Sequence, residues 1–268
     1  MGASVLRRWV GGAVLVAALL LTPVGASATA ELPPFPSNAT ADYQLGGGYP
    51  VAAELVVRDW REQPLPGAYN VCYLNPFQTQ PEHRKRWRKQ HPELLLRDRV
   101  GELLGDPNWP GEYLLDISTR KNRAALAAIS KKWIRRCAKA GFDAIEPDNL
   151  DSWTRSDGLL RKRHAVKLST KLVRLGHRAG LAVAQKNAVE LVGKRDRVGW
   201  DFAIVEDCQR YDECTDVISA YGDAVLAVEY RQRDFQRACA NHGAQISVVL
   251  RDRQLVPAGT ADYRYDSC

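Results

Sequence analysis

Residues 141–149 read Gly-Phe-Asp-Ala-Ile-Glu-Pro-Asp-Asn and outline one unit of a parallel α/β fold. The amphipathic stretch 122–140 before them predicts a helix, and Gly141 stands where its left-handed C-cap should fall. Phe142 to Glu146 is a short apolar run with little polar alternation, as expected for a strand buried on both faces. Acidic and amide side chains follow at once. The stretch therefore predicts a helix, a strand and a polar strand end in immediate succession.

The same order recurs along the chain, since longer helical patterns at 165–179 and 235–242 separate short apolar runs, and Gly180 again precedes a strand. The runs are 54–57, 70–74, 113–117, 142–146, 181–185, 201–205, 224–229 and 245–250. About eight strands with crossovers in some 240 residues favour a (β/α)8 TIM-like barrel. A doubly wound open sheet is the alternative, disfavoured because no Gly-rich phosphate turn follows the first strands. We expect an additional strand at Asp42-Tyr43-Gln44-Leu45, which leaves the identity of the first barrel strand open.

The N-terminus predicts export. Arg7 and Arg8 precede an apolar run from 10 to 21 and a small-residue stretch that allows cleavage after Ala28 or Ala30. We expect a signal peptide over 1–30 and a single domain over 31–268. The alternative is an uncleaved membrane anchor, for which the run is short of the roughly 20 residues that span a bilayer. The mature protein is expected to be secreted, monomeric and not inserted in a membrane.

The basic composition does not lead us to expect nucleic-acid binding. The formal charge of +7 becomes +5 without Arg7 and Arg8, because residues 1–30 hold no acidic residue. The cations cluster in helix-like segments such as 83–89 and 161–164, a pattern typical of solvated helix faces. The apolar fraction of 45% is enough for a full core.

Six cysteines in an exported chain permit disulfides. Cys208 and Cys214 flank a short loop that a bridge could close, and a bridge from Cys239 to Cys268 would tie down the tail. Cys72 and Cys137 lie in apolar elements, where a buried thiol is as reasonable as a bond. No C-x-x-C pair is present and the histidines are scattered, so we predict no metal site and no cofactor.

Polar residues follow six of the predicted strands, at the edge where the active sites of barrel enzymes lie. The predicted substrate-binding residues are Tyr43, Asn75, Trp109, Asp116, Glu146, Asn149, Asp151, Lys186, Asn187, Glu229 and Tyr230. Each has a simpler explanation taken alone: carboxylates such as Asp116 and Asp151 often cap helices, and asparagines occupy turns. Their convergence on one barrel mouth favours a site.

Glycoside hydrolysis fits these residues, because it needs two carboxyl groups that flank the scissile bond. Asp148 and Glu206 follow alternate strands, so they could face each other across the pocket and form the catalytic pair. Lys186 and Glu229 could separate their pKa values. Aromatic residues near the mouth would offer faces for sugar rings: Tyr43, Trp109, Trp153, Tyr211 and Tyr230.

Four segments resemble the endo-alpha-1,4-polygalactosaminidases of glycoside hydrolase family 114. They are Asn108-Trp109-Pro110-Gly111-Glu112-Tyr113-Leu114-Leu115-Asp116-Ile117, the run 141–149, Gln185-Lys186-Asn187, and the segment from Glu206 to Cys214 followed by Val228-Glu229-Tyr230. The resemblance implies a modified (β/α)8 barrel, extracellular cleavage of galactosamine-containing polysaccharide, Asp148 and Glu206 as catalytic residues, and a Cys208–Cys214 bridge. Two segments depart from the family's pattern, 72–80 and 42–45, and both would lie at the substrate cleft.

Two other functions fit the same residues less well. Glu146, Asp148 and Asp151 could bind Mg²⁺ with Lys186 as base, as in (β/α)8 lyases and isomerases. A non-catalytic barrel could bind sugar without cleaving it. For the hydrolase, a cationic substrate requires an acidic mouth on a basic protein, and Lys186 is the only clear cation expected there.

Overall fold

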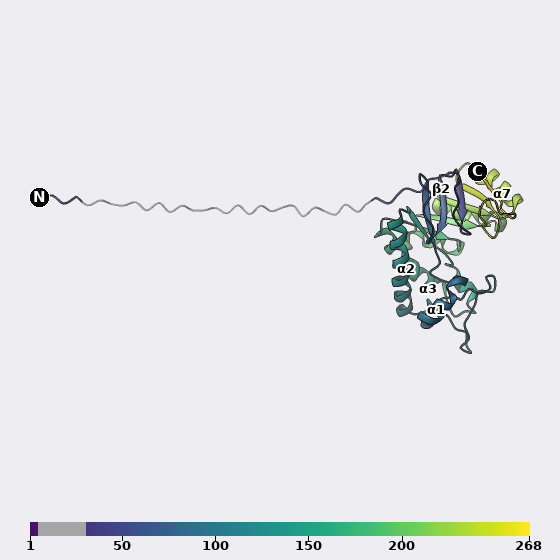
Figure 1. The fold of residues 1–268 in the computed structure, drawn as a ribbon, viewed down its shortest axis with the longest axis horizontal. Helices are drawn as coiled ribbons and strands as arrows, with labels where there is room; N and C mark the ends of the chain where they lie inside the picture. Colours follow the sequence, from purple (N-terminus) through teal and green to yellow (C-terminus); the bar gives the residue numbers. More distant parts are fainter. Residues whose placement is uncertain (5–30) are drawn as a thin grey trace. The chain divides into compact units, whose positions relative to one another are not determined.

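The computed structural model describes residues 1–4 and 31–268 (Figure 1). The predicted signal peptide lies almost entirely in residues 5–30, outside the described residues. Residues Glu31–Cys268 form one compact unit. No helix of the described residues has the length and apolar character needed to cross a membrane.

A nine-stranded sheet runs in chain order and forms a nearly closed barrel. Its strands are β1 (Ala41–Gln44), β2 (Leu55–Asp59), β3 (Tyr69–Leu74), β4 (Ala144–Pro147), β5 (Ala182–Lys186), β6 (Phe202–Glu206), β7 (Val225–Glu229), β8 (Ser247–Arg251) and β9 (Tyr265–Ser267). Strands β1 to β8 pair in parallel, and β9 pairs with β8 antiparallel. The backbone amides of Ala39 and Ala41 donate to Ser247 Oγ at 2.9 Å and Ser267 Oγ at 3.1 Å, which joins β1 to β8 and β9. The predicted barrel with an additional strand is therefore confirmed.

One detail of the predicted strand order is wrong. The run 113–117 is not a barrel strand; it makes only isolated antiparallel bridges, among them Gln78 with Leu114 and Leu95 with Leu115. The run belongs to the excursion, which is the segment 75–143 between β3 and β4. Its apolar side chains are buried within this excursion and not in the barrel wall. The identity of the first barrel strand, which the sequence left open, is β1 at 41–44, and the additional strand is β9.

Helices cover the outside of the barrel between the strands. They are α1 (Arg84–Gln90), α2 (Arg120–Ala140), α3 (Lys162–His177), α4 (Arg195–Val198), α5 (Cys208–Tyr211), α6 (Cys214–Tyr221) and α7 (Gln232–His242), with short 3-10 turns η1 (Pro81–His83), η2 (Pro92–Leu94), η3 (Ser152–Arg155) and η4 (Val189–Lys194). Thr119 caps α2 by accepting from the amide of Asn122. Gly141 ends α2 with φ 94°, as its position predicts. Helix α3 ends earlier than expected, and Gly180 follows it with φ 77°.

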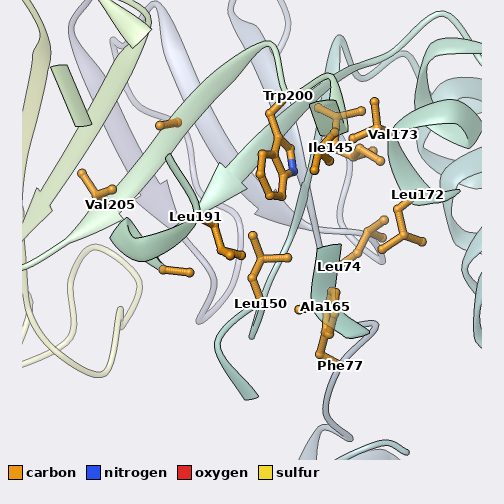
Figure 2. Packing of buried hydrophobic residues seen from close by; sticks show 14 of the residues in the cluster. Leu74, Phe77, Ile145, Leu150, Ala165, Leu172, Val173, Leu191, Trp200 and Val205 are labelled. Atoms are coloured by element: carbon orange, nitrogen blue, oxygen red, sulfur yellow. The ribbon is translucent and has the colours of Figure 1, made fainter. Parts of the chain in front are cut away.

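The core has two layers, because successive strand residues point to opposite faces. Inward side chains such as Val57, Ala184 and Ile204 fill the barrel. Outward side chains pack against the helices: Ile145 of β4 lies near Leu172 and Val173 of α3 (Figure 2). The second layer thus holds the strands in the positions from which their ends form the site.

Three disulfides tie helices and termini to the barrel. Cys72–Cys137 joins β3 to α2, Cys208–Cys214 encloses α5, and Cys239–Cys268 joins α7 to the segment after β9. The structure has both bridges suggested by spacing and also bonds the pair whose state the sequence left open.

Candidate active site

A pocket of about 470 Å³ opens at the carboxyl ends of the parallel strands. Residues after all eight parallel strands line it, including Leu45 after β1, Asp59 of β2, Asp148 after β4 and Arg253 after β8. This is the edge at which barrel enzymes carry their active sites. The loop 106–112 of the excursion before α2 adds Trp109, which is 45% exposed.

Lys186, the last residue of β5, is the centre of the pocket floor. Its Nζ lies 3.5 Å from Asp148 Oδ1, 3.2 Å from Glu206 Oε2 and 3.0 Å from Glu146 Oε1. It also donates to the hydroxyl of Tyr43 at 2.8 Å. Burial alone would lower the pKa of Lys186, but the three carboxylates outweigh it and raise the pKa well above its ordinary value. Lys186 therefore stays protonated and carries a positive charge between Asp148 and Glu206.

Asp148 is held by donors on both oxygens. Tyr73 of β3 donates its hydroxyl to Oδ2 at 2.8 Å, and the amide of Asn149 donates to Oδ1 at 2.6 Å. Its own amide bonds to the carbonyl of Leu74 at 2.8 Å, which fixes the end of β4 against β3. The carboxylate faces the pocket with its position determined by two strands.

Glu206, at the end of β6, is held in the same way. The hydroxyl of Tyr230 and the side-chain amide of Asn187 donate to its two oxygens, the latter at 3.0 Å. Asn187 also accepts from the amide of Glu206 at 2.8 Å. Burial would raise the pKa of Glu206, yet Lys186, Tyr230 and Asn187 together lower it below its ordinary value. Glu206 is thus stabilised as a carboxylate.

Glu146 lies beneath this pair and is fully buried. Tyr43 donates to its Oε1 at 2.8 Å, while no described residue hydrogen-bonds Oε2. Burial raises the pKa of Glu146 to about 7, although Lys186 opposes that shift. Glu146 therefore supports Lys186 from below and does not face the pocket.

Most of the predicted site residues converge. Nine of the thirteen line the pocket: Tyr43, Trp109, Asp148, Asn149, Asp151, Lys186, Asn187, Glu206 and Tyr230. Asn75 instead closes a turn by accepting from the amide of Gln78, and Asp116 accepts from Ser118 and Asn122 at the start of α2. Glu229 is buried and accepts from the amide of Gln209. Asp207 also lines the pocket, whereas Trp153, expected near the mouth, packs against the core.

Sequence reasoning missed the cations of the mouth. Lys186 is joined there by Arg61, Arg155 and Arg253. The lining carboxyl groups are Asp59, Glu82, Asp106, Glu112, Asp148, Asp151, Glu206 and Asp207. Eight acidic groups against four cations still leave an acidic mouth. Tyr73 was also missed, although it stands on the strand beside Asp148, where alternation along β3 would have suggested an inward side chain.

The cations pair with nearly all of these acids. The ion pairs are Arg61 with Asp59 at 2.6 Å and Glu82 at 2.8 Å, Arg155 with Asp106 at 2.6 Å and Asp151 at 2.7 Å, Arg253 with Asp207 at 3.4 Å, and Lys186 with Asp148 and Glu206 as above. Arg155 additionally donates to Asn149 Oδ1 at 3.1 Å. All of the lining acids except Glu112 are thus paired with a cation of the pocket.

The described residues contain one group of side chains with metal-like spacing, Cys208, Cys214 and Glu229. The two cysteines are bonded to each other, so their sulfur atoms are not available as thiolate ligands. Of the proposed Mg²⁺ ligands, Glu146 and Asp148 contact Lys186, and Asp151 pairs with Arg155. The three carboxylates are thus each engaged by a cationic side chain.

Solved structures with the same fold include two proteins that the chain covers almost completely. The crystal structure of Ega3 from Aspergillus fumigatus in complex with galactosamine superposes with a TM-score of 0.70 at 19% identity, over 89% of this chain and 98% of that one. The glycoside hydrolase domain of PelA from Pseudomonas aeruginosa gives 0.61 at 16% identity, over 84% and 99%. An alpha-galactosidase from Thermus thermophilus with stachyose gives 0.51 at 12% identity, over 85% and 64%.

Sequence comparison places the chain in a family. A search of curated proteins gave no match. The profile of the glycoside hydrolases GH114 matches residues 22–268, which is nearly the whole length and includes every residue of the pocket. This match decides among the three hypotheses in favour of hydrolysis: the chain belongs to glycoside-hydrolase family GH114 and is a glycoside hydrolase.

Proposed function

We propose that this hydrolase cuts α-1,4-linked galactosamine polymers internally and that Asp148 and Glu206 are its catalytic carboxyl groups. The observation that carries the proposal is their shared contact with Lys186 at the floor of the pocket, from the ends of the alternate strands β4 and β6. The family, the acidic lining and the galactosamine bound in the structure of Ega3 support the substrate class. The leader-like N-terminus and three disulfides support an extracellular location.

The spacing of the two carboxylates favours retention of anomeric configuration. Because Asp148 Oδ1 and Glu206 Oε2 lie 3.5 and 3.2 Å from the same Nζ, these oxygens are at most about 6.7 Å apart. Retaining enzymes place their carboxyl groups about 5–5.5 Å apart and inverting enzymes about 6.5–9.5 Å apart. Only the lowest part of the inverting range lies within this bound, so we propose that no water molecule fits between the second carboxylate and the anomeric carbon, as inversion would require. One carboxylate then attacks the sugar, and the other protonates the leaving oxygen.

Lys186 can divide these roles. An ammonium group that shifts toward one carboxylate stabilises it as the anion and lets the other hold a proton, which the reaction requires. Tyr73 and Tyr230 keep Asp148 and Glu206 in place during this shift.

Asp148→Asn and Glu206→Gln test the assignment. Each should lower the release of reducing ends from galactosamine polymer by about 10²–10⁴-fold or more, because loss of an acid, base or nucleophile has that effect. Asp216→Asn, which removes an exposed carboxylate on α6, is the matched control and should retain full activity. More than about a tenth of wild-type activity in either variant would refute that residue's role. A chelator should leave the wild-type rate unchanged.

Azide identifies the nucleophile. With Asp148→Ala and Glu206→Ala, the variant that lacks the nucleophile should regain activity with azide and give a glycosyl azide of inverted configuration. NMR of the first wild-type products should show the α-anomer. A first product in the β-configuration would overturn the retaining mechanism but leave the two residues assigned.

A further inference from the structure

One acidic group of the pocket lacks a cation. Seven of its eight carboxyl groups are ion-paired as described above. Glu112 is the exception, since no nitrogen of a charged side chain among residues 1–4 and 31–268 lies within 4.0 Å of it. At the other seven an incoming ammonium group would share the carboxylate with a guanidinium or with Lys186, whereas at Glu112 it would not.

Glu112 is nonetheless held in place. Its Oε2 accepts from the side-chain amide of Gln78 at 2.9 Å, and no described residue donates to Oε1. Its amide bonds to the carbonyl of Trp109 at 3.1 Å, and its carbonyl accepts from Asp106 at 2.9 Å. One carboxylate oxygen is therefore fixed and the other is free, and Trp109, three residues earlier in the same loop, lines the same pocket.

This carboxylate is connected to the catalytic centre. Gln78 also accepts from Arg155 at 2.9 Å, and the same guanidinium donates to Asn149, the neighbour of Asp148. Arg155 is anchored to the loop of Glu112 by its ion pair with the buried Asp106. A short chain of hydrogen bonds thus fixes Glu112 relative to the residue proposed to act on the scissile bond.

We propose that Glu112 and Trp109 form a subsite for one unacetylated hexosamine unit, with Glu112 binding its ammonium group and Trp109 packing on its ring. The proposal rests on the proposed function and makes it more specific. A carboxylate with a free oxygen offers a charge-assisted hydrogen bond to an ammonium group and none to the neutral amide of an N-acetylated sugar. The subsite therefore selects for free amines.

The surroundings of Glu112 add a pH signature. Burial raises its pKa to about 7; the hydrogen bond from Gln78 opposes this, and Asp148, Asp106 and Glu82 add to it. The cations of the neighbouring elements are Arg155, which donates to Gln78, and Arg84, whose guanidinium lies against Gly111. An ammonium ligand lowers this pKa, so its binding releases a proton. Affinity for the cationic polymer should rise as the pH increases through about 7.

The test compares wild type with Glu112→Gln on deacetylated α-1,4-galactosamine polymer and on its N-acetylated form. For the deacetylated polymer the substitution should raise KM about three- to tenfold with kcat nearly unchanged, and the fall in KM through pH 7 should disappear. For the acetylated polymer, KM and kcat of the variant should stay within about twofold of the wild-type values. Glu93→Gln, an exposed position outside the pocket, removes the same charge and should change neither.

The outcomes separate this proposal from the function on which it rests. If the wild type cleaves neither polymer, the proposed function fails. If the wild type is active and Glu112→Gln keeps its KM and its pH dependence, the subsite alone is refuted. Equal losses on both polymers would refute it as well, since they would show a structural role. Trp109→Ala should raise KM for both polymers, because a sugar ring packs on an indole whether or not it is acetylated.

Discussion

Three successive strands of the site end in the same backbone turn. Asn149, Asn187 and Asp207 follow Asp148, Lys186 and Glu206, and all three have positive φ, at 63°, 44° and 55°. Asn and Asp tolerate this left-handed conformation better than other residues that carry a side chain. Each turn ends its strand abruptly, so the preceding functional side chain points into the pocket.

Tyr230→Phe probes how Glu206 is tuned. The hydrogen bond from Tyr230 helps to lower the pKa of Glu206, so its loss should raise that pKa. The acidic limb of the kcat/KM profile should then move to higher pH, and kcat at the optimum should fall roughly tenfold or more. Rates measured from pH 3 to 9 would show it. A profile that falls in height without moving would mean that Tyr230 only positions Glu206.

Glu229 gives a prediction about stability outside the pocket. Burial raises its pKa to about 7, although the amide of Gln209 opposes the shift. A raised carboxyl pKa means that the folded state binds a proton that the unfolded state has lost above about pH 4.5. Stability should therefore decline as pH rises from about 4.5 to 7 and then level off. Glu229→Gln should remove part of that decline, on the order of 1–3 kcal/mol. Urea unfolding at pH 5 and pH 8 measures it, and an equal pH response in both proteins would contradict it.

The sequence predicted the site residues that directly follow a strand. Lys186 and Glu206 stand at the end of an apolar run, and Asp148 stands just beyond one, so sequence order alone placed them. Glu112 comes from the excursion and Arg155 from the loop after β4. The paths of both segments depend on tertiary contacts such as the buried pair of Arg155 with Asp106. No local pattern reveals such contacts, and the acidic mouth was therefore predicted without three of its cations.

At the scale of elements, the barrel was predictable because parallel strands are buried on both faces and read as apolar runs. The run 113–117 has the same character but is buried by the excursion, so burial alone misidentified it as a wall strand. Strand β9 has only three residues, none of them buried, and no apolar signal marks it. An apolar run therefore shows that a segment is buried but not which part of the molecule buries it.

The disulfides should separate stability from activity. Cys72–Cys137 closes a separation of 65 residues and joins β3 to α2, so replacing both cysteines with Ala should cost about 3–5 kcal/mol in unfolding free energy. Cys208–Cys214 closes only six residues, which stabilises less, but it encloses the helix that follows Glu206. Compared with loss of Cys72–Cys137, loss of Cys208–Cys214 should lower the free energy of unfolding less and kcat more. Urea melts and rates on both double variants measure the contrast, and identical effects would contradict it. Non-reducing peptide maps of the wild type should show both pairs.

At the scale of the molecule, charge is segregated. Helices α1, α2 and α3 contain 18 of the 38 Lys and Arg residues and no Asp or Glu. The three helices lie together (Figure 1). The ring centroids of Trp87 in α1 and Trp133 in α2 are 6.5 Å apart, and α2 packs on α3. The barrel mouth carries the excess of acids. A cationic polymer is thus repelled by this flank and attracted to the mouth.

Salt should reveal this arrangement. KM for the deacetylated polymer should rise with added salt, because screening acts within about 10 Å at 0.1 M ionic strength. KM for the neutral, acetylated polymer should change little. A salt series on both polymers measures the difference. Equal sensitivity, or tighter binding of the deacetylated polymer at high salt, would show that the mouth does not select substrate by charge.

The hydrogen bonds that close the barrel join its first strand to its last two strands. The amides of Ala39 and Ala41 bond to side chains 208 and 226 residues further along the chain. While the polypeptide is being synthesised, β1 has no partner on that side until β8 and β9 have appeared. An interrupted or shortened chain would therefore be an open sheet with two unpaired edges, and such edges readily join other chains. Before β8 and β9 are in place, the chain is therefore more prone to associate with copies of itself than the finished enzyme is.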